Sequence, residues 1–326
     1  MTGSGQPKYN NPLTATITGI LDRFRKQIPS GKLNSTDRLD GKKVLIDGAT
    51  SGLGFAIAVE LAKRGADVIM ACRSGIPEKG EKVKTLSGSA KVTMLHVDFS
   101  DIGSILKLAS ALDDHGPIDV YISNASIVSR HSRKTKQGLE EMFTVNYFSK
   151  FIFVNLLIKN KYFRDHDAIP RIIFVASETH RNPKRFEWDD FGIYKDYSIG
   201  KSITLYGYYK MLLVTFGAEL SRRLNAGEMK YSVFLLCPGP VNTNIGREAP
   251  RIFHPLMKLV FSIFFRSPAR AALPVIYLAA SPDQEGKSFD YLFLMSRKEV
   301  DEKSMDAENG KRLWELTEKL AGSLGL

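Results

Sequence analysis

The sequence contains few cysteines and no long apolar run. Only two cysteines, Cys72 and Cys237, occur among 326 residues, with no paired spacing and no Cys/His cluster. The chain therefore offers neither a disulfide framework nor a metal site, and we expect a reducing, cytoplasmic location. A bilayer-spanning helix needs about 20 apolar residues. The apolar stretch 256–265 is too short and is interrupted by Lys258. No secretory signal or internal repeat is evident.

The charge balance is basic, with 46 Lys and Arg against 35 Asp and Glu, for a formal net charge of +11. A nucleic-acid binder is one interpretation of this balance, but the charge is spread along the chain and no nucleic-acid motif accompanies it. We therefore expect no nucleic-acid partner. A chain that is 43% hydrophobic and 25% charged can bury one large α/β core.

A glycine-rich turn between a short apolar strand and an amphipathic stretch is the most informative motif. The strand ends at Asp47, and Gly48, Gly52 and Gly54 follow it before the helical pattern of residues 55–64. Glycine allows positive φ and close approach of the backbone to a pyrophosphate, and the helix N-terminus supplies amide donors. The run predicts a dinucleotide-phosphate site, although an ordinary strand-to-helix turn would give the same pattern.

A second apolar strand, 67–71, runs directly into Cys72 and Arg73. About 20 residues beyond the glycine turn, such folds place an Asp or Glu that accepts from the ribose 2′-hydroxyl. An arginine here can instead bind a 2′-phosphate, so the sequence favours NADP over NAD. A solvated loop cation is the alternative interpretation of Arg73.

Three more short apolar segments, 92–98, 118–126 and 171–177, each end in small polar residues. Apolar strands that alternate with helical stretches indicate a parallel sheet covered on both faces. The fold class expected is therefore α/β, a doubly wound parallel sheet, with ligand groups at the carboxyl ends of the strands.

The order of these motifs, from residue 40 to about residue 322, resembles the short-chain dehydrogenase/reductase superfamily. The resemblance implies a single Rossmann-fold domain over residues 41–326, preceded by an N-terminal arm, 1–40. It implies a catalytic tetrad of Asn146, Ser177, Tyr206 and Lys210. The cofactor-binding residues that it implies are Gly48, Ser51, Gly52, Leu53, Gly54, Arg73, Asp98, Asn124, Tyr206, Lys210, Pro238, Gly239, Val241 and Thr243.

The Tyr-x-x-x-Lys pattern of this family occurs twice, at Tyr197 to Lys201 and at Tyr206 to Lys210. The pattern needs a helix, because residues four apart then share one face. Gly200 interrupts the first pattern, whereas apolar residues recur at helical intervals after the second. We therefore expect Tyr206 and Lys210 to be the catalytic pair.

The resemblance also implies a division of roles among the tetrad. Tyr206 would exchange a proton with the substrate oxygen, and the adjacent Lys210 ammonium would favour its phenolate. Ser177 would donate to the same oxygen, and Asn146 would hold a water that links Lys210 to solvent. The hydride would come from the cofactor.

Two departures from the family pattern lie in the cofactor-binding turns, and a third is Tyr209, which precedes Lys210 where a small residue is more usual. Asp47 stands where a Thr or Ser usually precedes the first glycine, and Ser126 replaces the glycine of the Asn-Ala-Gly turn. A carboxylate beside a phosphate site is unfavourable unless it points away or binds a backbone amide. Asp47 and Ser126 suggest one alternative, an NADP-binding regulatory protein without turnover.

Within the superfamily, the sequence resembles the retinol dehydrogenase-like branch. It shares the strand ending Ala71-Cys72-Arg73 and a Ser-x-x-His segment from Ser177 to His180, and 29 positions separate Ser177 from Tyr206. The resemblance implies an NADP-dependent oxidoreductase that interconverts a hydrophobic alcohol with its aldehyde or ketone. The substrate would be a retinoid, steroid, polyprenol or fatty aldehyde.

Two segments suggest contact with a membrane surface. In residues 17–28, apolar side chains share one helical face that Arg23, Arg25 and Lys26 border, as in interfacial helices, although a helix docked on the domain would show the same pattern. The stretch 256–265 falls where the family has its substrate lid, and lining an apolar pocket, entering a bilayer or completing the core are the three interpretations of its large apolar side chains. We therefore expect peripheral membrane contact as an alternative to a purely cytoplasmic enzyme. The oligomeric state stays open, with a homodimer as one alternative.

Overall fold

The computed structural model of the protein describes residues 29–164, 168–239 and 267–326. Its centre is an eight-stranded sheet in the order β3-β2-β1-β4-β5-β6-β7-β8, parallel throughout except for the antiparallel pair β7 and β8. The strands are β1 (Lys43–Asp47), β2 (Asp67–Cys72), β3 (Val92–His96), β4 (Val120–Ser123), β5 (Arg171–Val175), β6 (Ser232–Cys237), β7 (Phe289–Phe293) and β8 (Ser296–Arg297).

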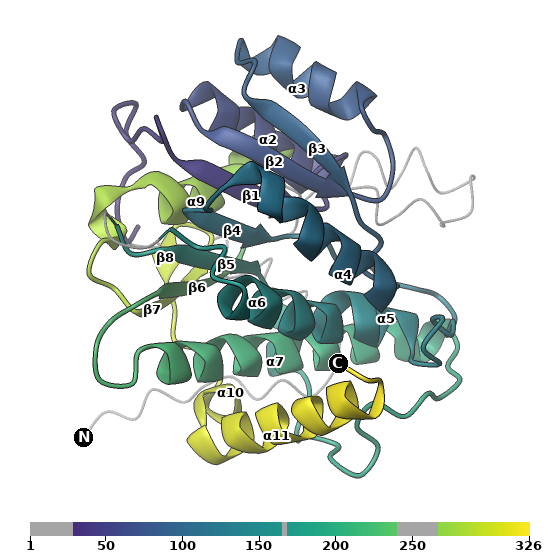
Figure 1. The fold of residues 1–326 in the computed structure, drawn as a ribbon. Helices are drawn as coiled ribbons and strands as arrows, with labels where there is room; N and C mark the ends of the chain where they lie inside the picture. Colours follow the sequence, from purple (N-terminus) through teal and green to yellow (C-terminus); the bar gives the residue numbers. More distant parts are fainter. Residues whose placement is uncertain (1–28, 165–167, 240–266) are drawn as a thin grey trace, which may run out of the picture.

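Helices cover both faces of this sheet, as Figure 1 shows. They are α2 (Gly52–Lys63), α3 (Glu78–Ser87), α4 (Ile102–Ala111), α5 (Glu141–Phe143), α6 (Ser149–Lys159), α7 (Ile199–Leu224), α9 (Pro268–Ala280), α10 (Glu302–Met305) and α11 (Ala307–Ser323). One hydrophobic core joins the sheet to α2 and α9, and the other joins it to α4, α6 and α7. The doubly wound α/β fold expected from the sequence is therefore confirmed.

The strands are apolar on both sides because successive side chains enter different cores. On β4, Val120 and Ile122 belong to the core beneath α2 and α9, whereas Tyr121 belongs to the core beneath α4 and α6. On β5, Ile173 and Phe174 divide in the same way. This alternation with a period of two explains why the strands appear in the sequence as continuous apolar runs.

The strand order reverses at β1, which lies between β2 and β4. The chain winds outward from β1 through β2 to β3, and then returns to β4 on the other side of β1. Open parallel sheets have a crevice at such a reversal, outside the carboxyl ends of the strands. The glycine turn that follows β1 therefore lies where a ligand is expected.

Residues 29–40, the end of the expected arm, contact the domain. The Ser30 backbone N–H donates to the carbonyl of Met295 at 2.8 Å, and the side chain of Ser30 accepts from the backbone N–H of Arg297 at 2.5 Å. The basic segment 17–28 and the apolar stretch 256–265 lie outside the described residues. Within the described parts of the chain, no helix is both long and apolar enough to cross a bilayer.

Helix α11 packs on the outer side of α7 (Figure 1). Trp314 anchors this contact, with its ring centroid 5.0 Å from that of Phe151 on α6 and 5.8 Å from that of Phe216 on α7. The Arg223 guanidinium lies 4.3 Å from the Trp314 ring centroid. Because the indole is only 8% exposed, it joins α11 to the core.

We expect Trp314→Ala to lower the free energy of unfolding by about 3 kcal/mol, because truncating a buried tryptophan removes apolar contacts and leaves a cavity. The midpoint of thermal unfolding should fall by several degrees. Leu106→Ala is the matched control, since Leu106 on α4 is 40% exposed. Equal shifts for the two variants would show that α11 adds little to the core.

Candidate active site and cofactor cleft

A cleft of about 570 Å³ opens at the carboxyl ends of the central strands. It brings together most of the site residues expected from the sequence: Gly48, Ser51, Gly52, Leu53, Gly54, Arg73, Asp98, Asn124, Ser177, Tyr206, Lys210, Pro238 and Gly239. Val241 and Thr243 lie outside the described residues. Asn146 does not line the cleft but packs behind it.

The glycine turn leaves no room for side chains at two of its positions. Gly48 has φ +65°, and a Cβ there would lie 2.8 Å from the Cα of Ala125. A Cβ on Gly54 would lie 2.3 Å from the carbonyl oxygen of Gly48. The turn therefore packs directly against the turn after β4, while the N-terminus of α2 faces the cleft. This arrangement fits a dinucleotide phosphate.

Asp47, one of the two departures in the cofactor-binding turns, is fully buried and hydrogen-bonds away from the phosphate turn. Its Oδ1 accepts from the backbone N–H groups of Asn124, at 2.7 Å, and Ala125. Its Oδ2 accepts from the Tyr121 hydroxyl at 2.7 Å and from the Lys150 ammonium at 2.9 Å. The carboxylate is thus neutralised beneath the turn after β4, and its charge does not oppose a bound phosphate.

Ser126, the other departure, is part of the same turn. Its hydroxyl donates to Oδ1 of Asn146 at 2.9 Å, and the Ile127 backbone N–H donates to the same oxygen at 2.8 Å. The Asn146 Nδ2 donates to the Ile127 carbonyl at 2.8 Å. Asn146 itself lies in a π-helical stretch, Thr144–Phe148, between α5 and α6. Such stretches often occur at functional sites. The Asn146 side chain therefore holds the turn that lines the cleft.

Ser177 follows the end of β5, and its neighbours orient its hydroxyl. The Ser177 Oγ accepts from the Thr179 backbone N–H at 3.3 Å and from the Thr179 hydroxyl at 3.0 Å. Since a hydroxyl accepts at two lone pairs, its own O–H is left to donate. The buried His180 ring has Nδ1 2.7 Å from the Ser177 carbonyl oxygen, so the Ser-x-x-His segment steadies the serine backbone.

Tyr206 and Lys210 stand one turn apart on α7 and face the cleft. The Lys210 ammonium donates to the Val175 carbonyl at 2.9 Å and lies 5.7 Å from the centroid of the Tyr206 ring. Burial raises the pKa of Tyr206 to about 12, although hydrogen bonding with Ser126 and Ser177 opposes the rise. The Tyr206 phenol is therefore protonated at neutral pH, as a proton donor must be.

The electrostatics of Lys210 depend mainly on burial. Burial, and to a smaller extent the charge of the nearby Lys150, lower the pKa of Lys210 to about 7, while Asp47 and Cys237 oppose this shift. The family resemblance implies that the Lys210 ammonium favours the Tyr206 phenolate. In the protein alone, desolvation of the phenol dominates instead, because even a half-buried phenolate loses part of its hydration.

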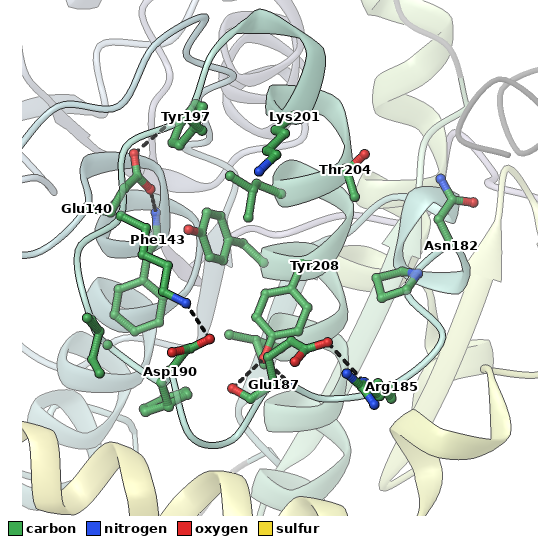
Figure 2. Close-up of a pocket in the computed structure, with 18 of the residues that line it drawn as sticks. Glu140, Phe143, Asn182, Arg185, Glu187, Asp190, Tyr197, Lys201, Thr204 and Tyr208 are labelled. Atoms are coloured by element: carbon green, nitrogen blue, oxygen red, sulfur yellow. Dashed lines mark hydrogen bonds and ion pairs between the residues drawn. The ribbon is translucent and has the colours of Figure 1, made fainter.

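The other Tyr-x-x-x-Lys pattern, Tyr197 to Lys201, lines a different cavity, of about 680 Å³, shown in Figure 2. There the Tyr197 hydroxyl donates to the buried Glu140 carboxylate at 2.9 Å, and Tyr208 of α7 lines the same cavity. Among the described residues, none that line this cavity also line the cofactor cleft. This separation supports the choice of Tyr206 over Tyr197.

Sequence reasoning did not identify two residues of the site, Lys150 and Tyr121. Both are buried, and both bind the carboxylate of Asp47. A signal for Lys150 was present, because a lysine within the mostly apolar segment 148–157, four positions after Asn146, needs an anionic partner if the segment is buried. Tyr121 carried no such signal, since an aromatic residue is ordinary in a buried strand.

The chain belongs to the short-chain dehydrogenase family. The family model for short chain dehydrogenases matches residues 42–187, and the relatives place the chain in the retinol dehydrogenase-like branch. It is accordingly an NAD(P)-dependent alcohol dehydrogenase/reductase of the short-chain type.

Among its relatives, retinol dehydrogenase 14 of Homo sapiens is 33% identical over 309 residues, covering 88% of each chain. Human retinol dehydrogenase 13 is 30% identical and covers 97% of this chain and 96% of its own. A crystal structure of an uncharacterized protein from Mycobacterium paratuberculosis, 26% identical, superimposes with a TM-score of 0.67 over 91% of this chain and 98% of its own. The structure of a gluconate 5-dehydrogenase homologue from Beutenbergia cavernae, with NADP bound, is 20% identical to this chain. It superimposes with a TM-score of 0.58 over 79% of this chain and 96% of its own, and supports the fold.

Both cysteines are free, line the cleft and are buried. Burial raises the pKa of the Cys72 thiol to about 11 and that of the Cys237 thiol to about 12. We therefore expect native protein at pH 8 to react with a disulfide reagent such as DTNB at least ~100-fold more slowly than unfolded protein, because the thiolate is the nucleophile. Fast release of two equivalents of thionitrobenzoate from native protein would contradict this burial.

Proposed function

We propose that the protein is an NADP-preferring oxidoreductase that interconverts a hydrophobic alcohol with its aldehyde or ketone. The observation that carries the proposal is the convergence of Ser177, Tyr206 and Lys210 on a cleft whose other end contains Arg73 and the glycine turn. One arrangement thus combines a proton donor with a site suited to a phosphate-bearing dinucleotide.

The side chains suggest how the reduction would proceed. The Tyr206 phenol, protonated at neutral pH, would transfer its proton to the carbonyl oxygen of the substrate. The Ser177 O–H would donate to the same oxygen and stabilise its developing negative charge. A bound nicotinamide cofactor would supply the hydride. The Lys210 ammonium would support the proton transfer and contact the nicotinamide ribose.

Arg73 supports the preference for NADP. It is exposed, lines the cleft directly beyond β2, and has Cys72 and Ser74 as its neighbours rather than a carboxylate. Without an Asp or Glu to repel a 2′-phosphate, a guanidinium at this point favours the phosphate-bearing cofactor.

The substrate class rests on the resemblance to the retinol dehydrogenase-like branch and on the two human relatives described above, both retinol dehydrogenases. A retinoid, or a steroid, polyprenol or fatty aldehyde of similar apolar character, is the proposed class. Contact with a membrane surface, which would supply such substrates, remains a proposal from the sequence.

No contact in the described residues favours the alternative of a regulatory protein without turnover. Asp47 and Ser126 make hydrogen bonds that hold the turn after β4, and neither replaces a reacting group.

We expect Tyr206→Phe to lower kcat by at least ~100-fold while changing the Kd for NADPH by less than about threefold, because it removes the proton donor and little cofactor contact. Reduction of retinal or a long-chain aldehyde, followed through NADPH absorbance, measures this. Tyr197→Phe is the matched control and should stay within about twofold of the wild type. A reversed ranking would show that the first Tyr-x-x-x-Lys pattern is catalytic.

We expect Arg73→Ala to raise the KM for NADPH by about 10- to 100-fold and to leave the KM for NADH within about twofold, because only NADPH presents a phosphate to the guanidinium. Steady-state kinetics with each cofactor and the same aldehyde measure the two values. Equal losses with both cofactors, or a wild-type preference for NADH, would refute the assignment of Arg73.

A further inference from the structure

We propose that the buried ion pair between Asp47 and Lys150 positions the cofactor site, by holding the turn after β4 against the glycine turn after β1. The proposal rests on the proposed function and extends it to two residues that contact neither substrate nor cofactor. Asp47 and Lys150 are therefore positioning residues, which act through the Asn124–Ala125 backbone and through the charge that Lys150 places near Lys210.

The pair is completely removed from solvent. The Lys150 ammonium lies 2.9 Å from Oδ2 of Asp47, and the two side chains are 1% and 0% exposed. The ammonium also lies 3.9 Å from the centroid of the Phe99 ring. A buried ion pair generally stabilises a fold no better than apolar residues of the same volume, whereas removal of one partner is strongly destabilising. Its value here therefore lies in the geometry that it imposes.

The two carboxylate oxygens of Asp47 bind different groups, and this sets the geometry. Lys150 and Tyr121 hold Oδ2, which leaves Oδ1 to accept from the backbone N–H groups of both Asn124 and Ala125. Asn124 in turn donates through Nδ2 to the Gly48 carbonyl at 2.9 Å. A single carboxylate thus fixes both turns that line the phosphate end of the cleft.

The pair also connects to the catalytic lysine. The charged and titratable groups that act on Lys210 are Lys150 from α6, Asp47 from β1 and Cys237 from β6. The charge of Lys150 lowers the pKa of Lys210, so its removal should raise that pKa. We expect the reductive rate to decline with rising pH as Lys210 loses its proton. In a variant with a neutral residue at position 150, this decline should occur at higher pH. A purely structural role would not cause such a shift.

The structure contains a matched control at the other end of the same strands. Asp119, directly before β4, is 7% exposed and accepts from the Lys43 backbone N–H of β1 at 2.8 Å and from the Arg164 guanidinium at 2.8 Å. It ties β1 to β4 as Asp47 does, but at the amino ends of the strands, away from the cleft. Asp119→Asn should therefore affect stability without affecting cofactor binding.

The test compares Lys150→Met, Asp47→Asn/Lys150→Met and Asp119→Asn in the full-length protein. We expect Lys150→Met to raise the KM and the Kd for NADPH at least ~10-fold and to lower kcat less than about threefold. The pH above which the reductive rate declines should shift to a higher value. The double variant should recover NADPH affinity to within about threefold of the wild type, because the uncompensated charge is gone and an amide oxygen still accepts from the turn. Asp119→Asn should lower the unfolding temperature and leave the Kd for NADPH unchanged.

Each other result counts against the pair. An unchanged NADPH affinity in Lys150→Met, no recovery in the double variant, or an equal loss in Asp119→Asn would overturn the positioning role, and an unmoved pH profile would overturn the link to Lys210. If Lys150→Met does not fold, Lys150→Gln carries the same measurements, since it removes the charge but keeps a donor. NADPH affinity is measured by fluorescence titration without turnover. Absence of wild-type turnover would therefore refute the proposed function separately from the ion pair.

Discussion

The carboxylate of Asp47 is the constraint on which the cofactor cleft depends. Four donors from β4, the turn after it and α6 converge on this one buried anion. It lies at the end of β1, where the winding of the sheet reverses and where two turns must pack closely enough that glycine is required at Gly48. A buried carboxylate is tolerated only when its charge is matched and its lone pairs are filled, so its partners cannot vary independently.

The same turn links cofactor binding to the chemistry. Ser126 joins it to Asn146, and hydrogen bonding with Ser126 and Ser177 partly offsets the effect of burial on the pKa of Tyr206. Residues from the π-helical stretch before α6, from the end of β5 and from α7 therefore meet around one short stretch of backbone. Asn146 is fully buried, so its polar groups need these partners, and a missing partner would be costly.

The long segment between Ser177 and Tyr206 has a structural consequence that the motif pattern did not suggest. It contributes Tyr197 to the wall of a separate cavity, where the Tyr197 hydroxyl binds the Glu140 carboxylate (Figure 2). Tyr197 precedes the start of α7 at Ile199, whereas Tyr206 and Lys210 stand one turn apart within that helix and line the cofactor cleft. The fold therefore separates the two Tyr-x-x-x-Lys patterns, although only nine positions divide them in the sequence.

The sequence by itself determined the fold class and the glycine turn, and favoured Tyr206 over Tyr197, because these depend on local patterns: apolar strands, glycines at fixed intervals and residues four apart on a helix. The other expected site residues followed from the family resemblance, and the structure brings most of them to the cleft. It could not decide where the Asp47 carboxylate points, since its partner Lys150 is 103 positions away along the chain. The tertiary structure decided this, together with the pKa values of Tyr206 and Lys210. Burial and the approach of distant charges set these properties, and both exist only once the helices have packed on the sheet.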